Sequence, residues 1–485
     1  MPVTRIFILA LFALCVSGQP LWAAEAEQGT IFTLWPLIDY RTSPAEGFSN
    51  LSLLGPIFKF QSKGEDRDTA FRPLFYRKDR SKGTARSTYF LYPAAFHENT
   101  PDSDTYEVLR LFQVSNFRKE EGEKRNSTTT LLPFYVAGES EKRGRYQAFI
   151  PFYGDIYDRF WRDEYHFVMF PLYGSTVKNG TTTKHYLYPI FSTTSGEKES
   201  GFEVFPLYGQ SHKEGVYRKR FVLWPFYTSE STGLGTDNPT EKSFLFPLYG
   251  RTDSPKKTAR TYLWPFFGYT EDRARQFKEV DYFWPFISTV RGEKRNGNTF
   301  LPLYSHDDYA DGGSKTWYLW PILKHEETRS NIFNRDQERV LYFLYRDSRE
   351  QWPKDGSTRR RMAMWPLFLY QKSPEGVSSL SLPALVESVL DKEGIEENWA
   401  PLWRLYQSRW DENGNSATSV LWNLFWKERR GEELAYELFP LVSYRKTKAD
   451  TDLKLLKGLV GLKRNGQESE LNLFWLPFGL KWGGT

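Results

Sequence analysis

A short apolar phrase recurs along this chain from residue 27 almost to the end. It begins with two or three apolar residues, often ending in Trp or Phe, continues with Pro, and closes with two more apolar residues. Leu34-Trp35-Pro36-Leu37, Phe170-Pro171-Leu172-Tyr173-Gly174 and Leu263-Trp264-Pro265-Phe266-Phe267 are examples. Polar segments of ten to twelve residues, rich in Gly, Asn, Asp, Ser and Lys, separate successive copies.

The prolines of these phrases return at a nearly constant interval. Twenty of the 28 prolines are in register, at positions 36, 56, 73, 93, 133, 151, 171, 189, 206, 225, 247, 265, 285, 302, 321, 366, 383, 401, 440 and 477. Apolar phrases without proline fill the larger gaps, near Gln113, Leu344, Asn423 and Leu459, which brings the total to 24 copies with a mean spacing of about 19 residues. A fixed period indicates a repeat architecture. We therefore expect residues 27–485 to form one repetitive domain.

Each phrase is predicted to be one β-strand and each polar segment to contain a turn. Aromatic and β-branched residues favour strands, whereas a proline in the middle of every apolar run would break a helix. Asn-Gly and Asp-Gly dipeptides favour hairpins, because both residues of a type I′ turn need positive φ; they lie at 179/180, 296/297, 311/312, 355/356, 413/414 and 465/466. The sequence thus predicts an all-β meander of about 24 antiparallel strands in one-strand repeats.

The amino-terminal residues 1–26 have the three-part pattern of a secretory signal peptide. Arg5 supplies the positive charge, Ile6 to Val16 form an apolar core too short for a spanning helix, and Ala24-Glu25-Ala26 is a small-x-small cleavage site. Cys15, the only cysteine, lies within the part that would be removed. The mature chain is therefore expected to have no disulfide, no cysteine metal site and no thiol nucleophile.

Composition narrows the choice of architecture, because 17 Trp, 29 Tyr and 38 Phe need a core, an interface or a membrane to bury them. An exported meander of about 24 strands resembles an outer-membrane β-barrel in strand count and composition. In lipid, only helices and closed barrels satisfy every backbone group. A closed outer-membrane barrel is therefore the favoured architecture.

Three features favour a soluble alternative, a propeller-like or stacked-sheet repeat protein. The alternate intervals between successive prolines, which would correspond to the connections on the two rims of a barrel, are alike in length. A wide barrel, in contrast, usually has short turns on one rim and long loops on the other. A proline at mid-membrane would remove a ladder donor where no water can replace it. Both faces of the strand expected at Thr261 to Tyr269 look apolar, so a lumen lined this way would hold water poorly.

Candidate chemistry is sparse in this sequence. Three of the six histidines, His97, His306 and His325, follow a register proline by four residues and precede an acid. Such His-carboxylate pairs could ligate a metal if copies of the pair lay side by side. In a meander with one strand per repeat, however, neighbouring strands would place the pair at opposite ends of the strands. We therefore interpret these residues as exposed side chains at strand exits. The acidic pairs Asp307-Asp308, Glu326-Glu327 and Glu396-Glu397 fall in polar connections. We expect no catalytic, metal or cofactor residues.

Charge adds little to these expectations. The 65 basic and 60 acidic residues give a net charge of +5 with no long block of one sign, which does not favour nucleic acid as a partner. The run Arg359-Arg360-Arg361 is interpreted as a membrane-rim or solvated cluster. Some aromatic side chains could offer stacking faces for glycan rings.

These patterns together predict an exported, non-enzymatic cell-envelope protein. The favoured hypothesis is an integral outer-membrane barrel that acts as a channel or conduit, with membrane lipid as its partner and lipid-like or amphipathic molecules as its cargo. The alternative is a soluble periplasmic or surface scaffold that binds glycan or protein partners through exposed aromatics.

Overall fold

The computed structural model describes residues 29–80, 85–117, 126–476 and 478–483. The predicted signal peptide at residues 1–26, with Cys15, lies outside these ranges, as does Pro477. The described chain is all-β, as the sequence predicted, and its 46 short strands belong to one antiparallel sheet in which successive strands pair as a meander. No backbone pairing between described residues joins β1 to β46, so the sheet is not closed by hydrogen bonds.

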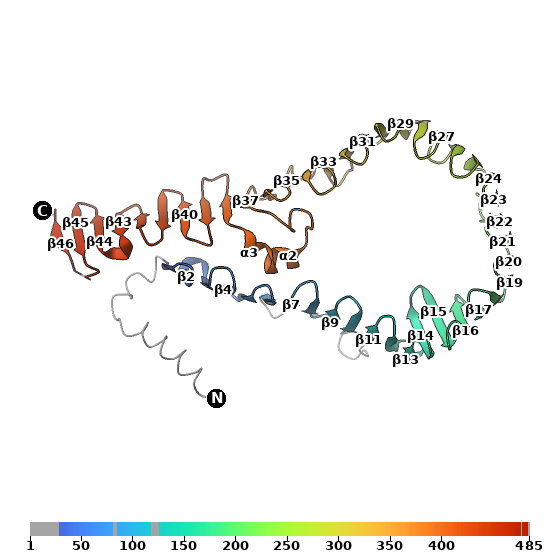
Figure 1. Ribbon diagram of the computed structural model, residues 1–485, viewed down its shortest axis with the longest axis horizontal. Helices are drawn as coiled ribbons and strands as arrows, with labels where there is room; N and C mark the ends of the chain where they lie inside the picture. The colour runs from blue at the N-terminus through green and yellow to red at the C-terminus, as the bar shows by residue number, and fades with distance from the viewer. Residues whose placement is uncertain (1–28, 81–84, 118–125, 477, 484–485) are drawn as a thin grey trace. The chain divides into compact units, whose positions relative to one another are not determined.

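The chain divides into two compact units, and strands β8 to β37 belong to the unit formed by residues 94–391 (Figure 1). These strands are β8(Ala95–Asn99), β9(Ser103–Val108), β10(Phe112–Phe117), β11(Asn126–Leu131), β12(Tyr135–Ser140), β13(Gly144–Phe149), β14(Tyr153–Arg159), β15(Arg162–Val168), β16(Tyr173–Lys178), β17(Thr181–Tyr186), β18(Phe191–Ser195), β19(Glu199–Val204), β20(Tyr208–Lys213), β21(Tyr217–Val222), β22(Tyr227–Thr232), β23(Thr240–Leu245), β24(Tyr249–Ser254), β25(Lys257–Tyr262), β26(Phe267–Asp272), β27(Phe277–Phe283), β28(Ile287–Gly292), β29(Arg295–Phe300), β30(Tyr304–Tyr309), β31(Ser314–Tyr318), β32(Leu323–Thr328), β33(Asn334–Val340), β34(Tyr345–Gln351), β35(Thr358–Met364), β36(Phe368–Lys372) and β37(Ser378–Leu382).

The other unit combines the two ends of the chain, residues 1–93 and 392–485. Its amino-terminal strands are β1(Ile31–Leu34), β2(Ile38–Ser43), β3(Phe48–Leu53), β4(Phe58–Lys63), β5(Asp66–Phe71), β6(Phe75–Arg80) and β7(Ala85–Phe90). Its carboxy-terminal strands are β38(Tyr406–Trp410), β39(Ser416–Val420), β40(Phe425–Arg430), β41(Glu433–Leu438), β42(Val442–Lys446), β43(Asp450–Leu455), β44(Val460–Asn465), β45(Glu468–Leu473) and β46(Leu480–Trp482). It also holds the helices α2(Glu393–Asn398) and α3(Ala400–Trp403) and the 3-10 turns η1(Pro44–Glu46) and η3(Leu456–Gly458). Among the described residues, no helix has the length and apolar character needed to cross a bilayer.

The apolar phrases form hairpin turns, so the prediction that each phrase is a strand centred on its proline was wrong. Pro171, for example, lies between β15 and β16, where Leu172 N–H donates to Met169 O at 2.8 Å. In the described chain 17 of the register prolines follow a cis peptide bond, the geometry of a type VI turn. One period of about 19 residues therefore contains two strands, which is why the sheet has 46 strands and not 24. None of the prolines that the structure describes lies at a strand centre, so none of them removes a donor there.

The polar connections form the opposite set of turns. Asn179 and Gly180 link β16 to β17 with φ angles of 47° and 76°, as a type I′ turn requires. Asn296-Gly297 is an exception among the predicted hairpin dipeptides, because it lies inside β29. Since turns of a meander alternate between its two edges, the phrases line one edge, here called the apolar edge, and the polar connections line the other, the polar edge. The two rims are therefore unlike, contrary to the expectation from their equal spacing.

The two faces of the sheet also differ. In Leu172-Tyr173-Gly174 and its repeats, the Tyr begins a strand and points to one side while the next residue points to the other. We call the first side the tyrosine face and the second the glycine face. The register places His185, Gly174 and Phe167 in one row of the glycine face, and Tyr173 between Tyr186 and Val168 on the tyrosine face.

In the unit that joins the chain ends, the glycine faces of the amino- and carboxy-terminal strands pack against each other. The Trp35 indole N–H donates to Leu421 O at 2.8 Å, and the Arg41 guanidinium lies 4.8 Å from the ring centroid of Trp426 and 2.5 Å from the Glu428 carboxylate. The repeat position that is Gly at 174, 209 and 250 in the other unit is aromatic at Tyr76 and Trp426, which are 0% and 4% exposed. Larger side chains at this position therefore fill the space between the two layers.

Candidate functional site

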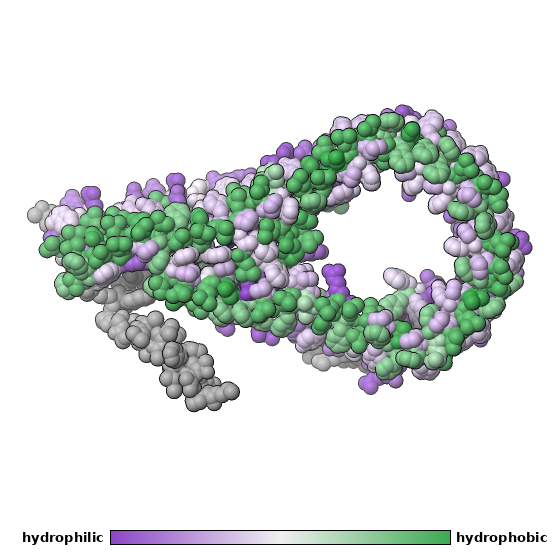
Figure 2. Space-filling model, viewed as in Figure 1, coloured by the Kyte–Doolittle hydropathy of each residue, from purple (hydrophilic) through white to green (hydrophobic). Residues whose placement is uncertain are grey.

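The apolar edge of the 94–391 unit carries a series of exposed hydrophobic side chains. Where Leu follows the proline of a turn it is about half exposed, at 55% for Leu207 and Leu248 and 52% for Leu303. The tryptophans that precede proline at 224, 264 and 320 are also exposed. Figure 2 shows the result as a green band along this unit, bordered by purple. Exposed apolar strips of this kind are typical of interaction surfaces.

A row of aromatic pairs borders this edge on the tyrosine face. The rings of Tyr249 and Tyr262 lie 5.4 Å apart across β24 and β25, and those of Tyr304 and Tyr318 lie 5.5 Å apart across β30 and β31. Further from the edge, the side chains become charged, as in the Arg260 to Asp253 ion pair of 2.8 Å. Apolar turns, then Tyr, then charged groups form the same order as membrane interfaces prefer.

A hollow of about 500 Å³ lies in the sheet of the same unit, around β20 to β25. Its lining includes Gly209, Thr228, Gly250 and Thr261, together with four aromatic residues, Phe221, Trp224, Phe244 and Trp264. Trp224 and Trp264 belong to the apolar edge, so this hollow opens beside it. Its size lies within the range of about 300–1,000 Å³ that is usual for small-molecule sites.

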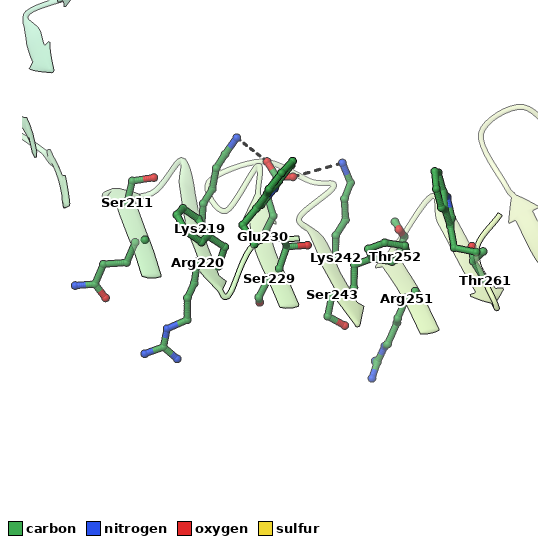
Figure 3. A pocket seen from close by; sticks show the side chains of 18 of the residues that line it. Ser211, Lys219, Arg220, Ser229, Glu230, Lys242, Ser243, Arg251, Thr252 and Thr261 are labelled. Carbon is green, nitrogen blue, oxygen red and sulfur yellow. Dashed lines mark ion pairs between the residues drawn. The ribbon is translucent and has the colours of Figure 1, made fainter. Parts of the chain in front are cut away.

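The end of the hollow away from the apolar edge carries a charged group of three residues. Glu230 on β22 lies between Lys219 on β21 and Lys242 on β23, with N to O distances of 2.8 and 3.8 Å (Figure 3). The hydrogen bond from Lys219 holds the pKa of Glu230 below its usual value, and the charge of Lys242 acts in the same direction. The three side chains therefore carry a net charge of +1.

A buried polar cluster lies in the unit that joins the chain ends. Arg72 donates to Glu397 O at 2.6 Å and to Pro56 O at 2.9 Å, and its guanidinium lies 5.6 Å from the ring centroid of Tyr76. Tyr76 donates to the Asp68 carboxylate at 3.0 Å. Burial raises the pKa of Glu397 and lowers that of Lys59, in each case by penalising the charged form. Every contact of this cluster joins parts of the chain to each other, so we assign it a structural role.

The histidines of the repeat lie mainly on the tyrosine face in polar surroundings. His306 and His325 occupy one row with Thr316 between them, because two strands per period put equivalent positions at the same height. The expectation that neighbouring copies lie at opposite ends was therefore wrong for this pair. Each has an acidic partner, Asp308 at 2.9 Å and Glu327 at 3.3 Å. No group of three or more His, Cys, Asp or Glu able to hold a metal occurs among the described residues.

The arginine run that was interpreted as a rim or solvated cluster has internal contacts instead. Arg360 binds both oxygens of Asp347, at 3.0 and 2.7 Å. Arg361 is 7% exposed and donates to Glu387 O at 2.5 Å. Two of the three arginines therefore stabilise the strand β35, in which they lie.

Sequence reasoning missed the hollow and the apolar edge, because both depend on whether each phrase is a strand or a turn. The tetrapeptide Pro-Leu-Tyr-Gly was a usable signal for the glycines, since Gly favours turns and close backbone or side-chain approach over strand interiors. Nothing in the local sequence signals that Lys219 and Lys242 converge on Glu230, because the register of three strands brings them together.

Comparison with known proteins adds no further assignment. No protein family model matches this chain, and no curated protein has a similar sequence at a significant level.

Proposed function

We propose that this protein is an exported, non-enzymatic component of a cell envelope that binds a lipid surface through the apolar edge of its sheet. The turns of this edge would lie within one leaflet, and the polar edge would remain in water. The observation that carries the proposal is the segregation of the apolar phrases to a single edge, with their Leu and Trp side chains half exposed. The predicted signal peptide supports export, and an outer membrane remains the favoured location.

Strand length supports insertion into one leaflet over a barrel that spans the bilayer. The strands have three to seven residues, and at about 3.3 Å per residue a six-residue strand is about 20 Å long. A transmembrane β-strand needs about 9–11 residues. Interfacial elements, in contrast, immerse their apolar side by about 5–10 Å, which corresponds to a turn and the first residue of each adjoining strand.

The order of side chains away from the edge supports the same orientation. The aromatic row on the tyrosine face would lie at headgroup depth, where Tyr and Trp are favoured. Arg220, which lies 5.7 Å from the ring centroid of Tyr208, and Arg260 come next and would lie among the lipid phosphates.

Vesicle flotation tests this function. The mature chain is mixed with vesicles of phosphatidylethanolamine and phosphatidylglycerol and centrifuged through a density gradient. We expect the wild-type chain to float, and the triple variant Leu207→Asp, Leu248→Asp, Leu303→Asp to float at least tenfold less, because three charges would have to enter the leaflet.

The matched control places the same charge on the polar edge. Val216, Leu234 and Ile332 are exposed by 47%, 44% and 74% but lie in polar-edge turns, so the triple variant Val216→Asp, Leu234→Asp, Ile332→Asp should float like the wild type. Equal flotation of the two variants, or a wild-type chain that stays at the bottom of the gradient, would contradict the proposal. Retention by a protein or glycan partner without flotation would favour a soluble scaffold.

A further inference from the structure

The hollow in β20 to β25 has its shape because two phenylalanine rings lean away from its centre. A Cβ atom added to Gly209 would lie 2.1 Å from Cε1 of Phe221, and one added to Gly250 would lie 2.7 Å from Cδ2 of Phe244. The rings of β21 and β23 thus cover β20 and β24, the strands on their outer sides. The strand between them, β22, presents only the small side chain Thr228 at this level.

The charged end of the hollow has the opposite arrangement. Lys219 and Lys242 come from the same two strands as the phenylalanines, but both lean inward to Glu230 on β22. Arg220 and Arg251 extend to the other side in Figure 3. There Arg220 donates to the Tyr208 hydroxyl at 3.3 Å, and Arg251 is paired with Asp253. The two lysines are therefore the cations that face the hollow, and with Glu230 they leave one positive charge at this end. Glu203, the other acidic lining residue, pairs with Gly209 and so lies nearer the apolar edge.

We propose that this hollow binds one lipid molecule with a single acyl chain along Thr228, between Phe221 and Phe244, and a monoanionic headgroup at Lys219 and Lys242. The inference rests on the proposed function, because the lipid would come from the leaflet that holds the apolar edge. A lipid in that leaflet has its chain toward the membrane interior and its headgroup toward water. The hollow has the same polarity, from Trp224 and Trp264 at the apolar edge to the lysines nearer the polar edge.

Charge complementarity selects the headgroup class. A carboxylate or a phosphodiester carries one negative charge and neutralises the net charge of the three side chains, whereas a neutral headgroup leaves both lysines bound to Glu230 alone. An acyl chain gains from the aromatic walls by removal of apolar surface from water, at about 25 cal/mol per Å². Binding should therefore require both the chain and the charge.

Equilibrium dialysis of the full mature chain against oleate, below its micellar concentration, tests the proposal. We expect one saturable oleate site per chain and at least fivefold weaker binding of monoolein, which has the same acyl chain without the charge. The double variant Lys219→Gln, Lys242→Gln should bind oleate at least fivefold more weakly and monoolein unchanged. Thr228→Phe should abolish the saturable site, because its ring fills the space over β22.

Two control variants lie on the opposite face of the sheet. Ser231→Phe adds the same ring three residues further along β22, and Lys278→Gln removes a lysine that binds Glu271 at 3.1 Å on the tyrosine face. Both should bind oleate like the wild type. Circular dichroism of all variants reports whether the sheet is intact.

The outcomes separate this inference from the proposed function. If the wild-type chain floats with vesicles but has no saturable oleate site, or if Thr228→Phe folds and binds oleate as before, the lipid site is wrong while surface binding stands. If the chain fails to float but has an oleate site that Thr228→Phe removes, the hollow is confirmed as an amphiphile site and the membrane proposal is wrong.

Discussion

At the scale of single residues, one position of the repeat decides what the glycine face can do. The residue after the phrase is Gly209 or Thr228 where the hollow lies, and Tyr76 or Trp426 where two layers pack. Further along the chain it is Gly268, and Asp281 is the residue opposite Gly268 on the next strand. A small side chain leaves space, an aromatic one fills it and a carboxylate adds charge. This choice is readable in the sequence only after the strand boundaries are known.

Asp281 gives a prediction about pH. Its carboxylate lies over Gly268, and one oxygen is buried without a hydrogen-bond partner among the described residues. Burial raises the pKa of Asp281 to about 6, with a smaller contribution from the charge of Glu279. The folded chain therefore binds this proton more tightly than the unfolded chain does, so the stabilisation is complete below about pH 4 and is lost as the pH rises through about 6.

The variant Asp281→Asn should remove this loss. We expect it to be more stable than the wild type at pH 8 by about 1 kcal/mol, which is less than the raised pKa alone would give because the group is partly exposed to solvent. At pH 4 the two should be equal. Urea unfolding at both pH values measures the difference, and Asp253→Asn, which removes the partner of Arg251, should give no gain at pH 8. Equal stability of wild type and Asp281→Asn at pH 8 would show that the carboxylate is well solvated.

At the scale of elements, the unit of the structure is a hairpin with an apolar turn at one end. The sequence predicted β-structure, antiparallel order and most of the polar turns, because strand propensity and turn dipeptides are local properties. It placed the strands wrongly, because an aromatic phrase fits an exposed turn as well as a buried strand. The proline was the distinguishing signal, since strand interiors avoid it and turns accept it.

Identical phrases provide a matched pair of substitutions at this scale. Phe-Pro-Leu-Tyr-Gly occurs at both Gly174 and Gly209, but the closest atom to an added Cβ is 3.9 Å away at Gly174 and 2.1 Å away at Gly209. Gly209→Ala should therefore destabilise the chain by about 1–2 kcal/mol, because the ring of Phe221 must move. Gly174→Ala should change stability by less than about 0.5 kcal/mol.

Chemical denaturation of the two alanine variants measures this difference. Phe221→Leu should recover part of the loss in Gly209→Ala, since a smaller side chain leaves room for the new methyl group. Equal stability of the two alanine variants would mean that the ring moves freely, and that the wall of the hollow is adaptable.

At the scale of the whole molecule, the two ends of the chain form one unit although the whole of residues 94–391 lies between them in the sequence. Face-to-face packing joins them through Trp35, Arg41 and Trp426, and an exposed ion pair of 3.0 Å links Glu46 to Arg430. In the part of the chain that the structure describes, no backbone pairing joins β1 to β46, so side-chain contacts and not a closed hydrogen-bond ladder link the two ends.

Cross-linking tests this arrangement. In the mature chain without residues 1–26, and so without Cys15, Glu46→Cys with Arg430→Cys should react with a short bis-maleimide to give one closed chain. After proteolysis within residues 94–391, the two end fragments should remain joined on a denaturing gel. The single variants are the controls and should give separate fragments, and failure of the double variant to cross-link would contradict the packing of the chain ends.

The sequence by itself determined the repeat period, the all-β class, the meander order and the separation of apolar from polar blocks, because these follow from local propensity and spacing. Only the tertiary structure decided that the phrases are turns on one edge, that Lys219 and Lys242 meet Glu230, and that the chain ends pack together. Each of these depends on the register between strands or on contacts between distant segments. The same local pattern fits an assignment with the apolar phrases in the strands and one with the phrases in the turns. The two assignments place different side chains on the exposed surface of the sheet.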